Sequence, residues 1–168
     1  KNDATVDLYD DHGLTAMKHA AWEDNEDIVR LLIKYGSNME ETSQQGTTVL
    51  MYAAENGSTN VARLLIDKGV DVNSVNTDGD TALILACQFG YDDIIELLIN
   101  AKAKVDHANN DGKTALMFAV RGCYLEALRL LINHGADINK GNRHGITSLM
   151  YAVWDGDTIV SRFLINKG

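Results

Sequence analysis

The sequence lacks several features that mark particular classes of protein. No run of about 18 apolar residues occurs among its 168 residues, so no membrane insertion is predicted. Residues 1–4 are without the apolar stretch of a secretory signal peptide. The only cysteines, Cys87 and Cys123, are too few for a disulfide framework in a chain that can build its own core. Free thiols fit a reducing compartment, and we therefore expect an intracellular, cytoplasmic location.

Basic residues are scarce relative to acidic ones. The chain has 15 Lys and Arg against 24 Asp and Glu, which gives a formal net charge of -9 at pH 7. A protein that binds nucleic acid carries a basic face, which here would act against the field of the whole molecule. We therefore expect no nucleic acid as partner. A protein or peptide with a basic segment fits this charge better.

Motifs for catalysis and for metal binding are missing as well. There is no Gly-x-Ser-x-Gly nucleophile elbow and no His-Glu-x-x-His zinc motif. Residues 111–114 resemble the end of a phosphate-binding loop, but the glycine required five residues before Gly112 is His107. Neither cysteine has a partner at metal-ligand spacing. We therefore expect no catalytic residue, no metal, no cofactor and no enzymatic activity.

The chain does contain a repeat with a period of 33 residues. Five copies agree at the same positions, which excludes chance, and such a period predicts an array of stacked units. The recurring residues are Gly13, Gly46, Gly79, Gly112 and Gly145; the threonines two residues after each glycine; Ala20, Ala53, Ala86, Ala119 and Ala152; and the Leu-Ile pairs that begin at Leu32, Leu65, Leu98, Leu131 and Leu164.

The fourth copy shows what each unit is predicted to form. Gly112 lies in a turn, and Thr114 stands where a hydroxyl can cap a helix N-terminus. Apolar residues at helical spacing then predict two helices, over 115–120 and 125–132. Gly135 is predicted to end the second helix in the left-handed conformation. No such unit buries its apolar face alone, so the copies must stack into a continuous core.

This pattern resembles the ankyrin-repeat family, most clearly in residues 112–116 and 130–139. The resemblance covers nearly the whole chain. It implies an all-α solenoid of stacked helix-turn-helix units with β-hairpin loops projecting at right angles, curved so that one side is concave. The family's usual activity is protein binding. We therefore expect a monomeric module that binds a partner protein or an extended peptide on its concave surface, as a scaffold or recruitment segment.

The sequence departs from the family pattern in two respects. The family commonly has proline after the turn threonine and histidine two residues later, whereas this chain contains no proline. The position of that histidine is taken by Lys18, Met51, Ile84, Met117 and Met150. In the third copy Lys102 replaces the cap glycine, which costs about 1 kcal/mol if the residue is left-handed.

The repeats predict a single domain over residues 1–168. Residues 1–9 align with the tail of a repeat, so the array is expected to be part of a longer one. The five repeats are predicted to span 10–42, 43–75, 76–108, 109–141 and an incomplete 142–168.

The partner-binding residues are predicted from positions that the fold leaves free. The family resemblance implies that the concave side consists of turn residues near the glycine and of the two residues that end each first helix. Three of the five helix-end pairs carry a large aromatic residue, and exposed aromatic and arginine side chains anchor interfaces. The alternative is that each ring packs on a neighbouring repeat. The predicted binding residues are Trp22, Glu23, Glu55, Asp80, Phe89, Lys113, Arg121, Arg143 and Trp154.

Charge and spacing suggest how a partner is oriented. These residues are acidic in the first half of the array and basic in the second, so a basic segment is expected toward copies one to three and an acidic one toward copies four and five. Trp22 and Trp154 lie four repeats apart, roughly 35 Å, which an extended peptide spans with about eleven residues.

Two alternatives stay open. The chain can be the recognition part of a larger enzyme, channel or effector whose chemistry is encoded elsewhere. It can also bind a small ligand or an oligonucleotide through its basic residues, with stacking on Phe89 and Trp154. The second alternative is weaker, because basic residues there are few.

Overall fold

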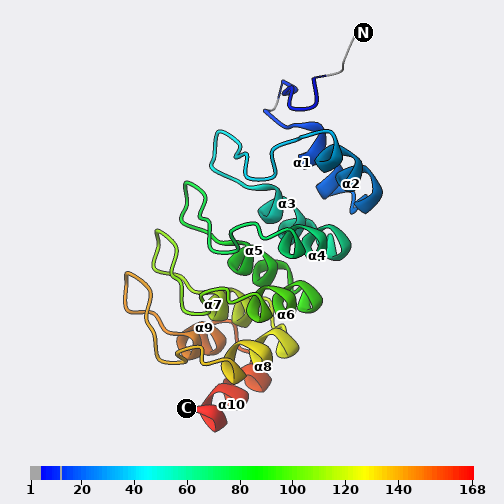
Figure 1. The fold of residues 1–168 in the computed structure, drawn as a ribbon. Coiled ribbons are helices and arrows are strands. Elements are labelled where there is room, and N and C mark those ends of the chain that lie inside the picture. Colours follow the sequence, from blue (N-terminus) through cyan, green and yellow to red (C-terminus); the bar gives the residue numbers. More distant parts are fainter. Residues whose placement is uncertain (1–4, 12) are drawn as a thin grey trace.

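Helices connected by loops make up the residues that the computed structural model describes, 5–11 and 13–168 (Figure 1). The predicted all-α class is confirmed. Residues 1–4 of the segment predicted to be a preceding repeat's tail lie outside the described residues. The ten helices in the described part are α1 (Ala16–Trp22), α2 (Glu26–Lys34), α3 (Val49–Asn56), α4 (Thr59–Asp67), α5 (Ala82–Phe89), α6 (Asp92–Asn100), α7 (Ala115–Arg121), α8 (Leu125–Asn133), α9 (Ser148–Trp154) and α10 (Thr158–Lys167).

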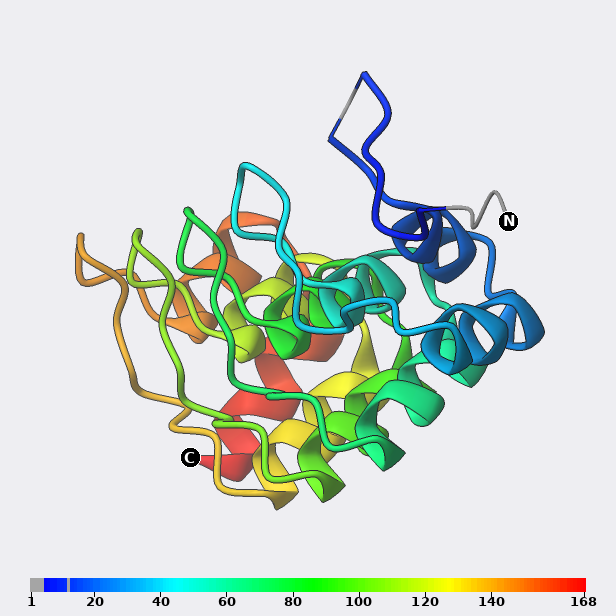
Figure 2. The same ribbon diagram turned by 45° about the horizontal axis from the view of Figure 1, so that its top comes forward.

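Consecutive helices pair, and the pairs stack in two layers. Each odd-numbered helix contacts the even-numbered helix that follows it. The odd-numbered helices also contact one another in order along the stack, as do α2, α4, α6 and α8. The loops that precede the odd-numbered helices extend as hairpins to one side of the layers (Figures 1 and 2). We number these hairpins 1 to 5, from the one before α1 to the one before α9.

Each odd-numbered helix begins after a threonine. The hydroxyls of Thr15, Thr48, Thr81 and Thr147 accept hydrogen bonds from backbone N–H groups three residues on, at 3.2 to 3.4 Å. Such a cap stabilises a helix by about 1 kcal/mol. Thr114 has the same extended backbone before α7, but its side chain makes no capping bond. The cap predicted for the fourth copy is therefore absent, although the helix begins at the predicted place.

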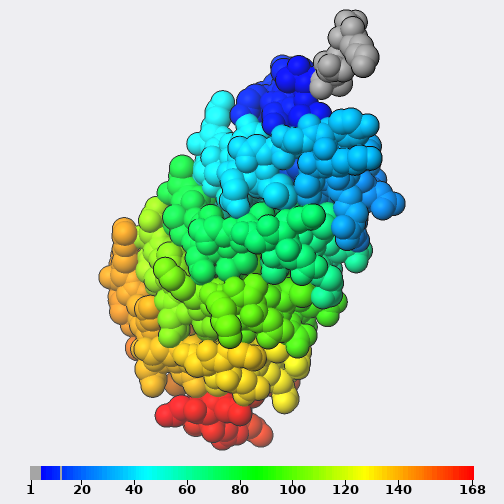
Figure 3. Space-filling view, in the orientation of Figure 1, coloured from blue at the N-terminus to red at the C-terminus, as the bar shows by residue number. Residues whose placement is uncertain are grey.

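The core runs without interruption through the stack. The recurring alanines of the odd-numbered helices are at most 6% exposed, and their small side chains let neighbouring helices approach closely. The recurring leucines of α4, α6, α8 and α10 are at most 1% exposed. Each such leucine contributes roughly 1.5–3 kcal/mol by burial. Successive pairs consequently lie directly against one another in the space-filling view (Figure 3).

Two of the predicted left-handed residues lie at the ends of even-numbered helices. Gly135, after α8, has φ +88°, which confirms it as the turn that ends this helix. Lys102, after α6, has φ +69°, so a side chain occupies the conformation that glycine adopts most easily. The expected cost of about 1 kcal/mol therefore applies at Lys102.

Main-chain hydrogen bonds link hairpins 2 to 5. The Thr77 N–H donates to the Gln45 carbonyl at 2.8 Å, and Asn110 and Arg143 repeat the contact with the hairpin before each. Isolated β-bridges close hairpins 4 and 5 at Ala108 with Thr114 and at Gly141 with Thr147. Hairpins 4 and 5 are thus each held by a single bridge, and no named strand forms within the described residues.

The turn glycines allow this close approach. A Cβ on Gly112 would lie 2.6 Å from the Arg143 nitrogen, and a Cβ on Gly79 would lie 2.8 Å from that of Asn110. Both glycines also have positive φ. A side chain would therefore meet both backbone strain and a clash at these two positions.

The joint between the first and second helix pairs differs from the others. A Cβ on Gly13 would meet nothing within 4 Å, so hairpin 1 does not lie against hairpin 2 as closely as later hairpins lie against each other. Lys18 occupies the register of Met51 and Met117 and is fully buried, but its Nζ has no hydrogen-bond partner among the described residues. This Nζ lies 5.7 Å from the centre of the Tyr9 ring. Within the described part of the chain, this ammonium is thus buried beside a ring and without a hydrogen-bond partner.

Candidate binding surface

One residue of each odd-numbered helix forms what we call the helix-end row: Trp22, Glu55, Gln88, Arg121 and Trp154. Trp22, Arg121 and Trp154 are the last residues of their helices, and the other two are next to last. Because these helices stack in register, residues 33 apart lie at the same height and are separated by about 8–10 Å per repeat. The row therefore runs along the whole stack beside the hairpins. We call the surface formed by this row, the residue after each member and the facing hairpin residues the inner surface.

Large aromatic side chains are exposed on the inner surface. Trp154 is 76% exposed, Trp22 50% and Phe89 42%. The Phe89 ring stacks on Tyr91 at 6.1 Å between centroids and 29° between planes. Part of Phe89 is thus used in packing, which is the alternative considered for these rings.

The exposure of Trp154 also follows from its place in the last helix pair, which has a neighbouring pair on one side only. Met150 and Val153 of this pair are likewise 54% and 64% exposed. In the preceding pair the equivalent residues, Met117 and Val120, are each 1% exposed. Trp22 has the second pair beside it and stays half exposed, so it is the stronger candidate for recognition.

Arg121 is held on the inner surface by aromatic packing. Its guanidinium lies 5.9 Å from the centre of the Tyr151 ring on the next helix pair. The Asn142 amide donates to the Tyr151 hydroxyl at 2.9 Å, which ties that ring to hairpin 5. A cation over a ring contributes about 0.5–1 kcal/mol at an exposed site. The guanidinium is therefore positioned while its N–H groups remain exposed.

The predicted hairpin charges are not equally free. Asp80 is half-buried and accepts a hydrogen bond from the Asn109 amide at 2.8 Å. Burial raises the pKa of Asp80, and the bond from Asn109 opposes that rise. Lys113 forms an ion pair with Asp111 at 3.1 Å, so much of its charge is offset. Asp80 and Lys113 thus contribute less to recognition than their charges suggest.

The remaining predicted residues are accessible. Glu23, the residue after Trp22, and Arg143, in hairpin 5, have exposed side chains, and Glu55 is half-buried. Arg143 is fixed through its backbone, because its N–H donates to the Asp111 carbonyl at 3.1 Å. Neither Arg143 nor Arg121 has an ion pair within the residues described. These two arginines are therefore the available cations of the inner surface.

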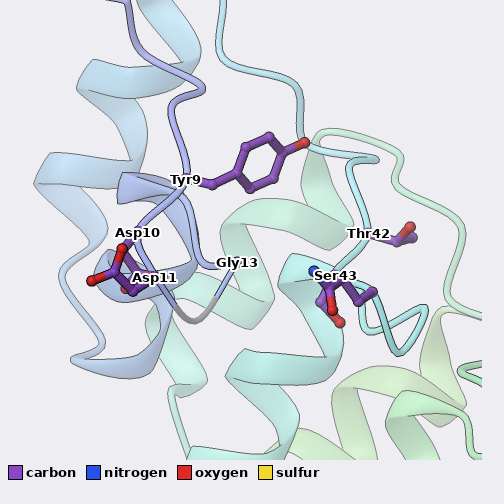
Figure 4. A pocket seen from close by; sticks show the side chains of 7 residues that line it. Tyr9, Asp10, Asp11, Gly13, Thr42 and Ser43 are labelled. Carbon is purple, nitrogen blue, oxygen red and sulfur yellow. The ribbon is translucent and has the colours of Figure 1, made fainter.

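A pocket of about 430 Å³ opens between hairpins 1 and 2 (Figure 4). It is lined by Tyr9, Asp10, Asp11, Gly13, Thr42, Ser43 and Gln44. Tyr9 is 58% exposed and points toward hairpin 2. The Asp10 carboxylate contacts the His19 imidazole at 2.8 Å. Sequence reasoning did not predict this pocket, although Tyr9 is the one aromatic residue in a register otherwise occupied by Thr42, Val75, Ala108 and Gly141.

The described residues contain no group of three or more His, Cys, Asp or Glu side chains that could hold a metal ion. Both cysteines are free, Cys87 in the core and Cys123 at the surface. Burial raises the pKa of the Cys87 thiol, which keeps it protonated. Among the described helices, none has the length and apolar character needed to cross a membrane.

Comparison with known proteins bears on the chain as a whole. A family model described as ankyrin repeats (3 copies) matches residues 20–109 and 101–168, which together take in most of the sequence. A search of curated proteins found no match.

Proposed function

Because the chain belongs to the ankyrin-repeat family, we propose that its inner surface binds a partner protein or a long peptide. Ankyrin repeats are generally protein–protein interaction modules, and the fold is typically non-catalytic. The observation that carries the proposal for this surface is the 50% exposure of Trp22, which persists although the second helix pair lies beside it. A tryptophan ring left half in water presents a large apolar area that a partner can cover. The chain then acts as a scaffold or recruitment segment.

The arrangement of the helix-end row supports the same proposal. Trp22 and Trp154 stand at its two ends, and Arg121 lies between them with exposed donors. Tryptophan and arginine are the residue types most enriched among those that dominate binding energy at interfaces. A partner that touches both rings must extend for roughly 35 Å, either as about eleven residues of extended chain or as a folded domain.

The organisation of the molecule is proposed to be one domain with the repeat boundaries predicted from the sequence. Support comes from the helices, since each pair lies within one predicted repeat. We also propose an intracellular, cytoplasmic location, supported by the two free thiols.

The test is a crosslinking pull-down from the source cells, followed by affinity measurement on the captured partner. Trp22→Ala and Trp154→Ala are each expected to weaken binding at least tenfold, the change that about 1.4 kcal/mol produces. Tyr35→Ala is the matched control, because Tyr35 is 67% exposed but lies at the end of α2, away from the row. Circular dichroism must show that all variants stay helical. Unchanged affinity in both tryptophan variants would refute the inner surface as the binding site.

A further inference from the structure

Charge changes sign along the helix-end row. Glu55 carries a carboxylate, Gln88 is neutral, and Arg121 carries a guanidinium. Trp22 and Trp154 lie outside these charges at the two ends. The row thus offers two apolar contacts that flank one negative and one positive position.

The facing hairpins repeat this order. Asp11 in hairpin 1 and Asp78 in hairpin 3 have exposed side chains, whereas Arg143 is exposed in hairpin 5. Hairpin 4 is close to neutral, because Asp111 pairs with Lys113 at 3.1 Å. Across these hairpins the charge therefore passes from negative to positive along the stack, and Asp155, the exposed residue after Trp154, adds a carboxylate at the far end of the inner surface.

The positive position suits a carboxylate in particular. Arg121 lies over the Tyr151 ring, so its side chain is already ordered before a partner arrives. A guanidinium presents five donors in a planar arrangement, which matches the two oxygens of a carboxylate. In a molecule of net charge -9, an acidic side chain is repelled by most of the surface and attracted here.

The spacing sets how far apart the complementary charges of a partner must be. Glu55 and Arg121 are two repeats apart, roughly 18 Å. At about 3.3 Å per residue, an extended chain covers that distance with five or six residues. The two tryptophans set the outer limits of the same segment.

We propose that the partner contributes one extended segment in which a basic residue opposite Glu55 is separated by five or six positions from an acidic residue opposite Arg121. Apolar residues of this segment cover Trp22 and Trp154. The inference rests on the proposed function, because it assumes that the inner surface is the binding site. It adds which residue types the bound segment carries and in which direction that segment runs along the row.

Selection from a display library of random 16-residue peptides tests the inference on the intact protein. The tightest peptide is then synthesised together with a version in which its basic and acidic residues are exchanged. The wild type is expected to prefer the selected peptide about tenfold, because the exchange turns two exposed ion pairs into two like-charge pairs. The double variant Glu55→Arg, Arg121→Glu keeps the net charge and is expected to prefer the exchanged peptide by a similar factor. The preference should shrink in 0.5 M salt, roughly a few times the physiological concentration, because screening weakens both pairs.

The control reverses a charge pair elsewhere. Glu26→Arg with Arg30→Glu swaps the ion pair of α2 and should leave the preference for the selected peptide unchanged. If peptide binding requires Trp22 and Trp154 but both peptides bind the wild type equally, the charge order is wrong and the proposed function stands. If the selected peptides bind Trp22→Ala and Trp154→Ala as well as the wild type, the proposed site itself fails.

Discussion

Replacing Lys18 by methionine should stabilise the protein. Lys18 is fully buried between the first two helix pairs, and its Nζ lacks a hydrogen-bond partner among the described residues. The same register holds Met51 and Met117, each 1% exposed, so a methionine side chain fits this environment. A buried polar group left without a partner costs about 1–3 kcal/mol, and a charged one costs more. Because the ammonium is desolvated, the contact with the Tyr9 ring returns about 2 kcal/mol, which offsets only part of the cost of burying a charge.

The expected gain for Lys18→Met is therefore about 2 kcal/mol in the free energy of unfolding. In a domain of this size that corresponds to an increase of roughly 6 °C in Tm. Urea unfolding followed by circular dichroism measures the whole stack. Trp22 emission in a Trp154→Phe background reports on the first pair, where the gain should be largest, because interface energies in repeat arrays are local.

The effect of Lys18 should also depend on pH. Burial lowers the pKa of Lys18 from its ordinary 10.5, so between the folded pKa and 10.5 the unfolded chain binds more protons than the folded one. Stability rises with pH wherever the unfolded state binds more protons. The destabilising effect of Lys18 is thus full below its folded pKa and is lost as pH rises toward 10.5. The advantage of Lys18→Met should shrink over that range.

The control for this substitution is Lys68→Met, which removes an exposed lysine after α4 and should change stability by less than about 0.5 kcal/mol. A Lys18→Met protein that is no more stable than the wild type would show that the ammonium is compensated. The reasoning about this joint would then be wrong.

Three further substitutions test other parts of the fold by thermal and urea unfolding. Gly112→Ala should destabilise by about 2 kcal/mol more than Gly145→Ala. Both glycines have positive φ, but only the new Cβ at 112 meets the Arg143 nitrogen, so equal losses would contradict the packing account. Ser148→Ala should stabilise by about 1 kcal/mol, because the buried hydroxyl has no hydrogen-bond partner in the described part of the chain; a loss of stability would mean that it has one. Lys102→Gly should stabilise by about 1 kcal/mol, because glycine adopts the left-handed conformation without strain. Unchanged stability would show that the backbone at Lys102 is not strained.

The fold could be predicted because it depends on backbone rules that repeat with the sequence. Glycine at the turn and threonine two residues later define where each odd-numbered helix begins. The left-handed conformation of Lys102 was also predictable, since it occupies a register that holds glycine elsewhere. Thr114 shows the limit of this reasoning. Its backbone follows the pattern, but whether its hydroxyl bonds depends on a side-chain rotamer that the sequence does not fix.

The candidate site was less predictable, because its geometry depends on side chains from different repeats. The row of helix-end positions follows from the period, and the half exposure of Trp22 agrees with its place there. The stacking of Phe89 on Tyr91 and of Arg121 on Tyr151 depends on distances between neighbouring units.

One signal at the first joint was present in the sequence. Residue 18 is a lysine, whereas the equivalent residues of the other copies are Met or Ile. This difference could have indicated that an ammonium lies in the core. The pocket beside Tyr9 was harder to predict, because the distance between two hairpins depends on how both of them pack and not on the sequence of either hairpin alone.

Hairpins 2 to 5 hold one another through main-chain atoms, as in the bond from the Thr77 N–H to the Gln45 carbonyl. Exposed side chains such as those of Gln45, Asp78 and Asp111 are therefore not needed for this link. Mutation can change these side chains while the hairpin spacing stays the same. A lineage that carries this array can thus acquire new partners through surface substitutions alone, and a designer can randomise the same positions without rebuilding the scaffold.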